Sequence, residues 1–370
     1  MSRRLIVNYQ KKPCYEIVFA ASFAGLGTEI SSLNLCAKKV CIVTDTLVGP
    51  LYADEVRGIL ETLGFECLLF CFNAGEQYKN LDTVRHLYRF LIENKLTRKD
   101  VLVALGGGVV GDVCGFAAAT YLRGIDYIGL PTTLLAQVDS SIGGKTGVDF
   151  DDYKNMVGAF FMPRLVYINT KTLDSLPDRQ YFNGFAEVMK HGLIKSAAYY
   201  EWLLTHMDAI CERSPEIVAQ MIEKSCAIKK AVVEKDPHET GQRALLNFGH
   251  TLGHALETAS AYKLLHGEAV ALGMVCAAYI SWQKGHLAME EYYEIRDMFV
   301  AFDLPISVGN LDAKTVLSYT KSDKKVESDG LKYILLEKVG ASFIDKSVTD
   351  EEMMAALETI LPYSERSDAE

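Results

Sequence analysis

The sequence predicts an α/β domain with a mostly parallel sheet over residues 1–180 and a mainly α-helical domain over residues 181–370. Three observations support this division. The chain has 370 residues, which is long for one hydrophobic core. Its first half alternates short apolar β-rich runs with helix-like stretches, which is typical of a parallel sheet covered on both faces. After about residue 181 the β-rich runs largely stop and helical spacing takes over.

The expected elements follow in chain order. The β-rich runs of the first half lie at residues 15–19, 40–44, 67–72, 101–105, 127–130 and 165–168. The clearest helix between them spans residues 82–96, where Val84, Leu87 and Leu91 recur at helical spacing. Helical patterns of the second half lie at residues 184–204, 215–233, 244–259, 268–284 and 290–302. Pro215 suits a helix start and Gly285 a helix end, a β-like run follows at 332–338, and the polar tail after Pro362 is expected to fray.

Composition excludes several classes of protein. Hydrophobic residues make up 49% and charged residues 23%, as in ordinary globular proteins. The net charge of −10 argues against nonspecific nucleic-acid binding, although a local group of Lys and Arg could hold an anionic substrate. The nine scattered cysteines fit a reducing compartment, and no signal-peptide pattern or bilayer-length apolar run is present. We therefore expect a cytoplasmic protein with no membrane partner.

A glycine-rich turn follows the run at 101–105. Residues 106–112 read Gly-Gly-Gly-Val-Val-Gly-Asp, which fits the dinucleotide-binding pattern between a strand and a helix. The order departs from a standard Rossmann fingerprint, which lies on the first strand with its ribose-binding acid about 20 residues later. Here Asp45 instead ends an earlier strand. The turn indicates a nucleotide site in a nonstandard order, and a plain strand–helix turn is the alternative.

Small polar and basic residues gather after the run at 127–130. Thr132 and Thr133 follow it, and residues 143–146 read Gly-Gly-Lys-Thr. This resembles the end of a phosphate-binding P-loop but lacks the leading glycine, so no ATPase is indicated. We expect a flexible turn that presents Lys145 and hydroxyl groups, with Lys154 and Asn155 shortly after it. A solvated loop without function is the alternative.

Metal-ligand residue types are concentrated in the second half. Three of the eight histidines lie at His250, His254 and His266, close to an Arg and an Asn that can grip anions. Glu187 and Lys190 share a helix face, which is more often a surface ion pair. Catalytic zinc requires three protein ligands and an open position. Spacing alone leaves open which three of the following would bind it: Glu187, His191, His250, His254 and His266.

Taken together, these motifs resemble the 3-dehydroquinate synthase family of sugar-phosphate cyclases from about Asp45 to Gly340. The most specific pieces are residues 106–112, 120–124, 143–146, 154–160, 184–190, 246–254 and 323–325. The resemblance implies an NAD-binding α/β domain with a Rossmann-like sheet, a helical domain, and an active site in the cleft between them. Two departures stand beside the cofactor region: residues 148–153 lack the Pro and Gly common in relatives, and Asn169 replaces a common Asp.

The resemblance also implies roles for individual residues. Asp45 would hold the adenosine ribose of NAD, and the other cofactor-site residues would be Glu76, Lys79, Gly107, Gly108, Asp112, Thr132, Thr133, Asp139, Lys154 and Ser175. Zn²⁺, or Co²⁺, would bind Glu187, His250 and His266. Substrate-binding and catalytic positions would be Lys145, Asn155, Lys190, Lys229, Arg243, Asn247, His254, Lys324, Lys325 and, from the neighbouring subunit of a homodimer, Arg123. Two choices stay open: Lys324 or Lys325 at the pocket, and Lys190 or His254 as proton relay.

The implied reaction converts 3-deoxy-D-arabino-heptulosonate 7-phosphate to 3-dehydroquinate and phosphate, in the shikimate pathway of aromatic amino acid biosynthesis. It proceeds by transient oxidation by NAD, phosphate elimination, re-reduction and intramolecular aldol cyclisation, so the enzyme is a carbon–oxygen lyase. A 2-deoxy-scyllo-inosose synthase-type cyclase is the nearest alternative, and Lys229 and Arg243, as carboxylate partners, favour the dehydroquinate reaction. A metal-dependent glycerol or alcohol dehydrogenase would leave the basic residues without a purpose. A noncatalytic binding protein would not need all three sets of candidates.

Overall fold

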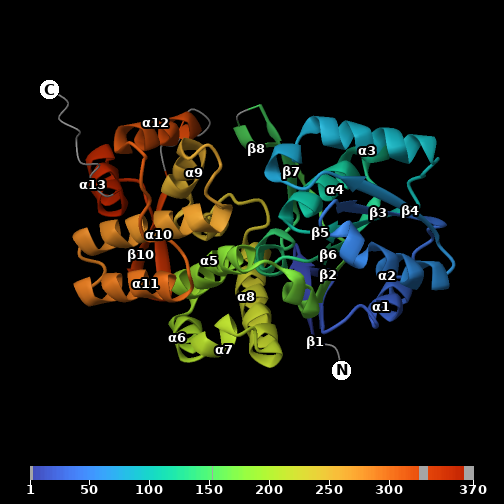
Figure 1. The fold of residues 1–370 in the computed structure, drawn as a ribbon, viewed down its shortest axis with the longest axis horizontal. Coiled ribbons are helices and arrows are strands. Elements are labelled where there is room, and N and C mark those ends of the chain that lie inside the picture. The colour runs from blue at the N-terminus through green and yellow to red at the C-terminus, as the bar shows by residue number, and fades with distance from the viewer. Residues whose placement is uncertain (1–2, 152, 325–331, 362–370) are drawn as a thin grey trace. The chain divides into compact units, whose positions relative to one another are not determined.

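The computed structural model describes residues 3–151, 153–324 and 332–361. The chain forms two compact units (Figure 1). Unit 1 comprises Met1–Leu176 and Val218–His238, and unit 2 comprises Pro177–Ile217 and Glu239–Glu370. Most of helix α8 (Pro215–Lys235) therefore belongs to unit 1, whereas the division expected at residue 180 assigned it to the second domain. The reason is bonding to the first half of the chain, because Glu234 accepts hydrogen bonds from the backbone and side chain of Asn8.

Unit 1 is built on one seven-stranded sheet. In spatial order its strands are β1 (Arg3–Tyr9), β2 (Lys12–Ala20), β9 (Leu165–Asn169), β6 (Asp126–Pro131), β5 (Val101–Gly106), β3 (Lys39–Asp45) and β4 (Glu66–Phe72). Only the β1–β2 pair is antiparallel. The mostly parallel sheet predicted from the sequence is thus confirmed, and every β-rich run expected there is a strand. The edge strand β1 escaped prediction because its sequence begins with two arginines and is partly exposed.

The strand order reverses between β3 and β5. From β3 the chain moves outward to β4, then returns to the other side of β3 to form β5, and continues through β6 to β9. Ligands of open α/β sheets bind at such a reversal, outside the carboxyl ends of the strands. Asp45 ends β3 and Gly106 ends β5, so both flank this point. Topology therefore explains how an acid far upstream of the glycine-rich turn can serve the same site.

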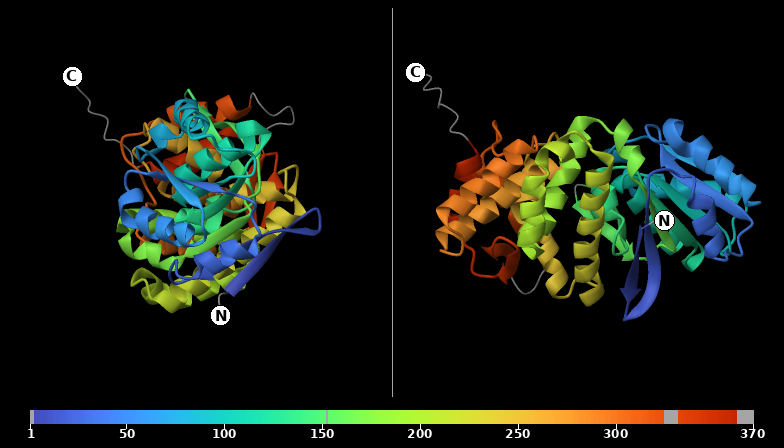
Figure 2. Two further views of the ribbon diagram at one scale, coloured as in Figure 1. Left: turned by 90° about the vertical axis from the view of Figure 1, so that its right-hand side faces the viewer. Right: turned by 90° about the horizontal axis from the view of Figure 1, so that it is seen from below.

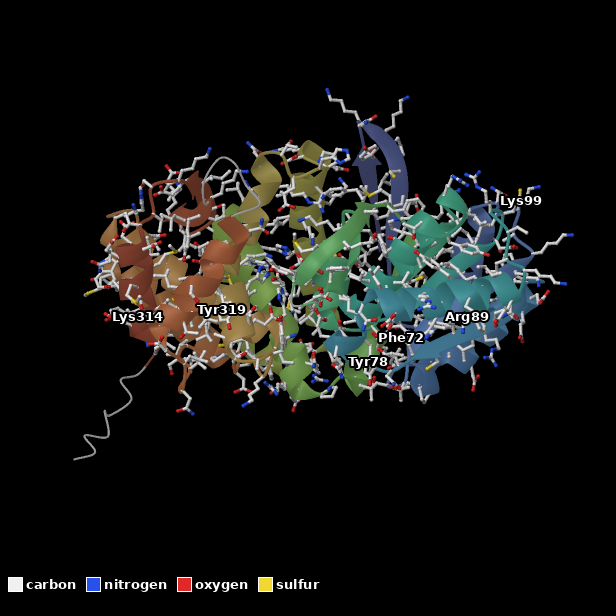
Figure 3. All side chains as sticks on the ribbon, turned by 90° about the horizontal axis from the view of Figure 1, so that it is seen from above. Phe72, Tyr78, Arg89, Lys99, Lys314 and Tyr319 are labelled. Carbon is white, nitrogen blue, oxygen red and sulfur yellow. The ribbon has the colours of Figure 1, made fainter. Side chains whose placement is uncertain are left out.

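Helices cover both faces of the sheet (Figures 1 and 2). Helices α1 (Leu26–Ser32) and α2 (Gly49–Thr62) pack on one face, and α3 (Leu81–Glu93) and α4 (Gly108–Thr120) on the other. Strand side chains alternate between the two layers, since Ile42 packs with α1 and α2 whereas Val43 packs with α3 and α4. Phe72 and Tyr78, labelled in Figure 3, belong to the α3–α4 layer. The helix predicted at 82–96 is confirmed as α3.

The segment after Gly143 forms a hairpin, so the flexible turn expected there is wrong beyond residue 144. Strands β7 (Lys145–Phe150) and β8 (Tyr153–Phe160) pair antiparallel. Val148 is fully buried against the α4 layer, and Val157 packs there too. The glycines and lysines of this segment favour a loop, but its apolar side chains pack on the α3–α4 layer and hold it as a hairpin.

Unit 2 is mainly helical, as predicted. Its helices are α5 (Asp178–Lys195), α6 (Ala197–Thr205), α7 (Met207–Cys211), α9 (His250–Ala259), α10 (His266–Gln283), α11 (Met289–Ala301), α12 (Ala313–Lys324) and α13 (Asp350–Ile360), with a hairpin of β10 (Tyr333–Lys338) and β11 (Ala341–Asp345). Helix α10 is buried along most of its length and contacts α5, α9, α11 and α13. None of the described helices combines the length and apolarity needed to cross a bilayer.

Two helices of the second half differ from expectation. The helix predicted at 184–204 breaks at Ser196, whose extended backbone ends α5 and whose side chain accepts a hydrogen bond from the Tyr199 amide to start α6. The helix predicted at 244–259 begins as the 3₁₀ turn η5 (Gln242–Asn247) and only then becomes α9. Pro215 starts α8 and Gly285 follows α10 in the left-handed region, both as predicted. The tail after Pro362 lies outside the described residues.

Candidate active site

Close helix packing in unit 2 brings three candidate metal ligands together. Glu187 lies in the middle of α5, while His250 and His266 are the first residues of α9 and α10. The start of α10 rests directly on α5, because a Cβ at Gly267 would overlap the carbonyl oxygen of Asn183. The Gly267 amide also donates a 2.6 Å hydrogen bond to the Asn183 side chain. Only glycine permits this approach, so the position of His266 relative to α5 is fixed by its neighbour.

A second close contact sets the position of α9. A Cβ at Gly273 of α10 would overlap the carbonyl oxygen of Gly249, the residue before His250. The two helices therefore meet backbone to backbone at the N-terminus of α9. Together the two glycine contacts place the first turns of α9 and α10 over α5.

The side chains converge accordingly. Glu187 is fully buried, and its Oε1 lies 3.7 Å from Nε2 of His250 and 3.7 Å from Nε2 of His266. One ligand atom from each residue falls within 4.8 Å of the others. The Nδ1 atom of His250 lies 3.2 Å from the carbonyl oxygen of Phe248, so an Nδ1–H there leaves Nε2 for a metal. One carboxylate and two imidazoles are a donor set that suits Zn²⁺ or Co²⁺ with an open position.

The charges around this set are tightly coupled. Lys190, which is 1% exposed, forms an ion pair with Glu187 within α5. Burial, and then the Lys190 charge, lower the pKa of His250 well below its usual range, which keeps that imidazole neutral. Burial alone would lower the pKa of His266, but hydrogen bonding and charge from Glu187 and Glu257 raise it to about 9 in the metal-free chain. A metal must therefore displace a proton from His266.

His254 lies beside the metal candidates, one helical turn after His250. Its ring centroid is 5.2 Å from that of His250 and 5.9 Å from that of His266. It also forms a second group with Glu257 and His266, whose ligand atoms lie within 4.8 Å of one another. The geometry thus offers two overlapping triads that share His266. Glu257 was missed from the sequence, although it lies on the helix of His250 and His254 at helical spacing.

Two further candidates of unit 2 lie on η5. Arg243 is 1% exposed, and the Asn247 amide donates a 2.8 Å hydrogen bond to Glu239. A guanidinium keeps its charge when buried, so Arg243 is a strong candidate for holding an anion. Lys324 ends α12, but its side chain lies outside the described residues, as does all of Lys325.

The glycine-rich turn of unit 1 joins β5 to α4. Gly107 precedes the helix and Gly108 begins it, so the amides of its first turn lie at the strand-order reversal. The Thr132 amide donates to the Gly106 carbonyl at 2.9 Å, which places the Thr132–Thr133 segment alongside the turn. Asp45 lies across the reversal, and its Oδ1 accepts hydrogen bonds from the amides of Leu47 and Val48. These residues form a shared edge suited to a dinucleotide.

An ionic network borders this edge. The Lys79 ammonium lies 2.8 Å from Asp112, donates to Asn155 Oδ1 at 2.6 Å, and lies 3.8 Å from Glu76. Glu76 in turn pairs with Lys154 at 3.3 Å. Burial alone would lower the pKa of Lys79, but Asp112 and Glu76 raise it above its usual range. The network ties the turn at η1 (Glu76–Tyr78), helix α4 and the β7–β8 hairpin into one polar cluster.

Asp149 supports this cluster and was missed from the sequence. Its Oδ1 accepts a 2.8 Å hydrogen bond from the Asn155 amide, and its own amide donates to the Lys79 carbonyl at 2.8 Å. Asn155 has a φ of 55°, in the left-handed region, so this bond holds an unfavourable backbone in place. Within the unusual segment, the described residues Phe150 and Tyr153 pair across the hairpin, after a register shift that follows Val148. Asn169 likewise serves local structure, since its Oδ1 accepts from the Lys171 amide.

Of the remaining predicted residues of unit 1, Lys145 lines one pocket with Gly107 and Asp112, and the others lie outside that pocket. Lys229 of α8 bonds the backbone and carboxylate oxygens of Asp139 at 2.8 and 2.7 Å. Lys145 is exposed at the start of β7. Ser175 is hydrogen-bonded to the Tyr52 hydroxyl at 2.6 Å. Arg123 is exposed and follows Leu122, with φ of 67° and 51°, a strained left-handed pair that presents the arginine outward.

Comparison with protein families and curated sequences gives consistent matches over most of the chain. Residues 69–183 match the family described as 3-dehydroquinate synthase N-terminal, and residues 184–326 match 3-dehydroquinate synthase C-terminal. A 3-dehydroquinate synthase of Nitrosospira multiformis is 46% identical over 312 residues, which cover 84% of this chain and 85% of the relative. A 3-dehydroquinate synthase of Acetivibrio thermocellus is 41% identical over 351 residues, which cover 95% and 97%.

Solved structures of similar fold include two sugar-phosphate cyclases and, at 14–17% identity and TM-scores of 0.62–0.69, dehydrogenases and reductases, which share the fold alone. A 2-deoxy-scyllo-inosose synthase complexed with carbaglucose-6-phosphate, NAD⁺ and Co²⁺ is 26% identical, with a TM-score of 0.86 over 96% of this chain and 99% of that one. A 2-epi-5-epi-valiolone synthase of Streptomyces hygroscopicus with NAD⁺ and Zn²⁺ bound is 27% identical, with a TM-score of 0.88 over the same shares. These cyclases therefore share the two-part architecture of an α/β and a helical region described above.

Proposed function

Because this chain belongs to the 3-dehydroquinate synthase family, we propose that it converts 3-deoxy-D-arabino-heptulosonate 7-phosphate to 3-dehydroquinate and phosphate. The observation that carries the proposal is the buried Glu187–His250–His266 donor set, with Lys190 beside it, in a chain whose two halves both match this family. The reaction places the protein in the shikimate pathway. Its substrate is a small sugar phosphate with an anionic group at each end.

Two groups outside the polypeptide complete the chemistry. NAD, when bound, supplies a hydride acceptor and donor, and a divalent metal supplies a Lewis acid for a substrate oxygen. Glu187, His250 and His266 hold the metal, Zn²⁺ or Co²⁺. The NAD residues are those of the strand-order reversal and the ionic network, together with two residues outside them. The first group is Asp45, Glu76, Lys79, Gly107, Gly108, Asp112, Thr132, Thr133 and Lys154, and the other two are Asp139 and Ser175. Two structurally similar cyclases contain NAD⁺ with one of these two metals, which supports the pairing.

The chain's own residues bind the anionic substrate and move protons. Lys145, Lys229 and Arg243 supply positive charge for a phosphate and a carboxylate, while Asn155 and Asn247 hydrogen-bond hydroxyl groups. Lys190, buried beside Glu187, holds or accepts the proton of the hydroxyl that is oxidised, and His254 is the other candidate for this relay. One of Lys324 and Lys325 completes the anion site. These assignments predict an enzyme that binds a doubly anionic substrate next to a metal.

We also propose a cytoplasmic homodimer in which Arg123 acts in the neighbouring subunit's site. The support is the exposed position of Arg123 on a left-handed backbone, and all nine cysteines are free, as in a reducing compartment. Mixing Arg123→Ala subunits with Lys145→Ala subunits should restore activity, because some heterodimers keep one site with both residues. Absence of activity after proven subunit exchange would refute the trans role.

The reaction is tested by incubating the purified protein with NAD, Zn²⁺ and the heptulosonate phosphate. One phosphate and one 3-dehydroquinate should form per substrate, with no NADH accumulating at steady state. A carba-analogue that cannot release phosphate should leave bound NADH visible by absorbance. NADH released in proportion to substrate would identify a dehydrogenase instead. A higher kcat/KM for glucose 6-phosphate would identify an inosose-type cyclase.

A further inference from the structure

We propose that Glu257 is a positioning residue for the metal ligand His266: its carboxylate accepts the Nδ1–H of the imidazole and so presents Nε2 to Glu187. The inference rests on the metal site of the proposed function. It adds a residue that the sequence did not single out, and it assigns a role to a buried carboxylate that the proposed function leaves without one.

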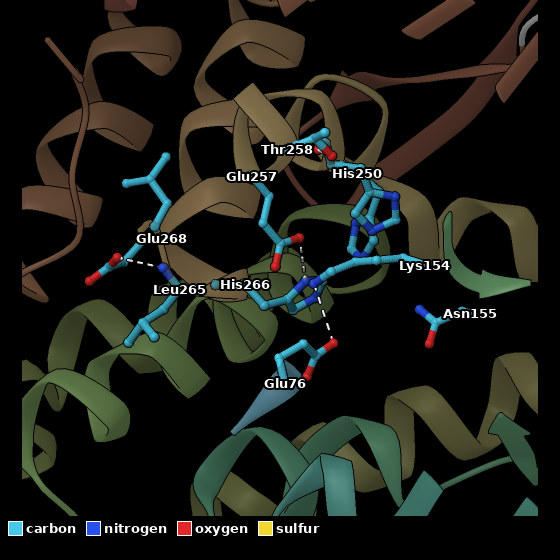
Figure 4. A network of polar contacts seen from close by, with 12 residues as sticks. Glu76, Lys154, Asn155, His250, Glu257, Thr258, Leu265, His266 and Glu268 are labelled. Carbon is cyan, nitrogen blue, oxygen red and sulfur yellow. Dashed lines mark hydrogen bonds and ion pairs between the residues drawn. The ribbon is translucent and has the colours of Figure 1, made fainter. Parts of the chain in front are cut away.

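The imidazole of His266 lies close to the carboxylates of Glu187 and Glu257, and Figure 4 shows the contact with Glu257. Its Nε2 is 3.7 Å from Oε1 of Glu187, and its Nδ1 is 3.7 Å from Oε2 of Glu257. Both carboxylates are almost inaccessible, with Glu187 at 0% and Glu257 at 4% exposure. The distances are those of ion pairs, and a ring shift of roughly 1 Å would bring Nδ1 into hydrogen-bond range. One ring nitrogen therefore faces each carboxylate.

A carboxylate at the position of Glu257 gains stability from an N–H donor. It is buried in the last turn of α9, where the helix dipole presents negative potential and disfavours a carboxylate. A buried charge is also costly without compensation. An imidazole N–H that points at the carboxylate reduces both penalties.

Other contacts already hold the backbone on both sides of His266. The orientation of its imidazole ring must therefore be fixed by a different contact. Glu268 accepts a 2.8 Å hydrogen bond from the Leu265 amide, and both its oxygens bond Arg179 of α5, at 2.6 and 2.8 Å. Arg179 also donates to the Lys263 carbonyl at 3.1 Å. This clamp spans the residues on both sides of His266 but does not touch its ring.

The two histidine ligands are then oriented by different means. The Nδ1 of His250 meets the carbonyl oxygen of Phe248, two residues before it in the chain. The Nδ1 of His266 meets the side chain of Glu257 on a different helix. Metal-bound histidines commonly donate to either kind of acceptor, and a carboxylate makes the imidazole the more basic ligand. Loss of Glu257 should therefore weaken metal binding without removing a ligand.

A rival interpretation makes Glu257 itself a ligand, because His254, Glu257 and His266 also converge within 4.8 Å. The variants Glu257→Ala and Glu257→Gln separate the two. Glutamine keeps an oxygen that accepts the Nδ1–H but loses the negative charge that a ligand needs. Glu290→Gln, an exposed position on α11, removes the same charge elsewhere in unit 2 and serves as the matched control.

The experiment measures Zn²⁺ affinity by chelator competition and records ¹⁵N NMR of the His266 ring in the full-length protein without substrate. Glu257→Ala should weaken Zn²⁺ binding about 10- to 100-fold. Glu257→Gln should lose less than about tenfold, since it retains an acceptor. The control should bind as the wild type does. In the wild-type zinc form the spectrum should show a protonated Nδ1, and this signal should broaden or shift in Glu257→Ala.

Two results would overturn the inference. Wild-type affinity in Glu257→Ala would show that the carboxylate does not position His266. Complete loss of metal in Glu257→Gln, equal to that of His250→Ala, would make Glu257 a ligand. If Glu257→Ala does not fold, the glutamine variant and its spectrum decide. A wild type that binds Zn²⁺ but forms no 3-dehydroquinate would refute the proposed function and leave the role of Glu257 standing.

Discussion

The candidate sites of the two units are built in opposite ways. In unit 2 the metal candidates are carried by helices that meet backbone to backbone, and Glu187 and Lys190 are almost completely buried. In unit 1 the cofactor candidates lie on strand ends, a glycine turn and a hairpin, and ion pairs around Lys79 link them. A metal requires a few atoms placed to a fraction of an ångström, whereas a dinucleotide is long and is bound largely by backbone amides. The tight helix packing of unit 2 suits a metal site, and the strand ends and glycine turn of unit 1 suit a dinucleotide site.

Removal of one metal ligand should have the largest effect on metal binding and activity. It tests whether the helices of unit 2 form the metal site. His250→Ala is cleaner than a change at Glu187, because Glu187 also neutralises buried Lys190. We expect more than a 100-fold loss of Zn²⁺ affinity, beyond the range of outer-sphere changes, and loss of turnover. Metal content and activity are measured together, with exposed His286→Ala as control. Full metal occupancy in His250→Ala would remove this residue from the site.

The rigidity of unit 2 can be tested through its glycine contacts. Gly267→Ala should destabilise the protein by about 1–3 kcal/mol, because the added Cβ overlaps the Asn183 carbonyl and the helices must separate. Zn²⁺ affinity should fall as His266 moves away from Glu187. Urea unfolding and chelator competition measure the two effects, and Gly58→Ala, where a Cβ meets nothing nearby, is the control. Unchanged stability would show that α5 and α10 can move apart at Gly267 without loss of packing energy.

Asp45→Asn tests the unit 1 site with a change that spares the fold. The amide oxygen can still accept from Leu47 and Val48, so the start of α2 should hold. Loss of the charge should weaken NAD binding about tenfold, the cost of one charge-assisted hydrogen bond, and should reduce discrimination against NADP. Calorimetry measures the binding of both dinucleotides, with Asp54→Asn, an exposed position on α2, as the control. Wild-type protein that binds NADP as well as NAD would contradict the role of Asp45.

The smallest effect on ligand binding is expected at the amino ends of the strands, where Asp100 precedes β5 and holds backbone amides. Its carboxylate accepts hydrogen bonds from the Thr97 amide and hydroxyl and from the amides of Lys38 and Lys39. Burial alone would raise the pKa of Asp100, but these bonds lower it below its usual range. Asp100→Asn should therefore cost about 1–2 kcal/mol at neutral pH and leave NAD and metal binding unchanged.

The pH dependence of that cost follows from the direction of the shift. A carboxyl whose pKa is depressed by folding contributes stability above its unfolded pKa of about 3.9. This contribution is lost as the pH falls through the lower pKa of the folded state. Denaturant unfolding across pH 2–7 should show the wild type and Asp100→Asn converging at the acid end. A gap that stays constant with pH would mean that charge is not the cause.

Sequence patterns predicted the parts of each unit that depend on periodicity. The apolar strands and helix α3 were found because buried elements repeat at regular spacing. The hairpin at β7–β8 was not predicted because its glycines and lysines suggest a loop, although Val148, Val157 and Ala159 anchor it to the α3–α4 layer. The break at Ser196 is set by a capping bond that outweighs the helical pattern on either side.

The candidate site was predictable only in part, because contacts between different helices and strands leave no local pattern in the sequence. Histidine spacing left five possible metal ligands, and the resemblance to a known family chose three of them. The contact of Glu257 with His266 could not be read from spacing, because it depends on how α9 and α10 pack. The position of Asp45 relative to the glycine turn likewise depends on strand order, which no local pattern encodes. The sequence shows which residue types are present. Which residues of different helices and strands lie next to each other is decided by the fold.

The path of the chain through α8 limits how the gene of such a protein can recombine. The chain leaves unit 1 after Leu176, returns to it from Val218 to His238, and then leaves again. A gene fragment ending near residue 180 would encode the sheet but not Lys229, whose partner Asp139 belongs to that sheet's unit. Recombination at that point would therefore separate two bonded residues. The two units are expected to be exchanged between genes only together, as one indivisible cassette.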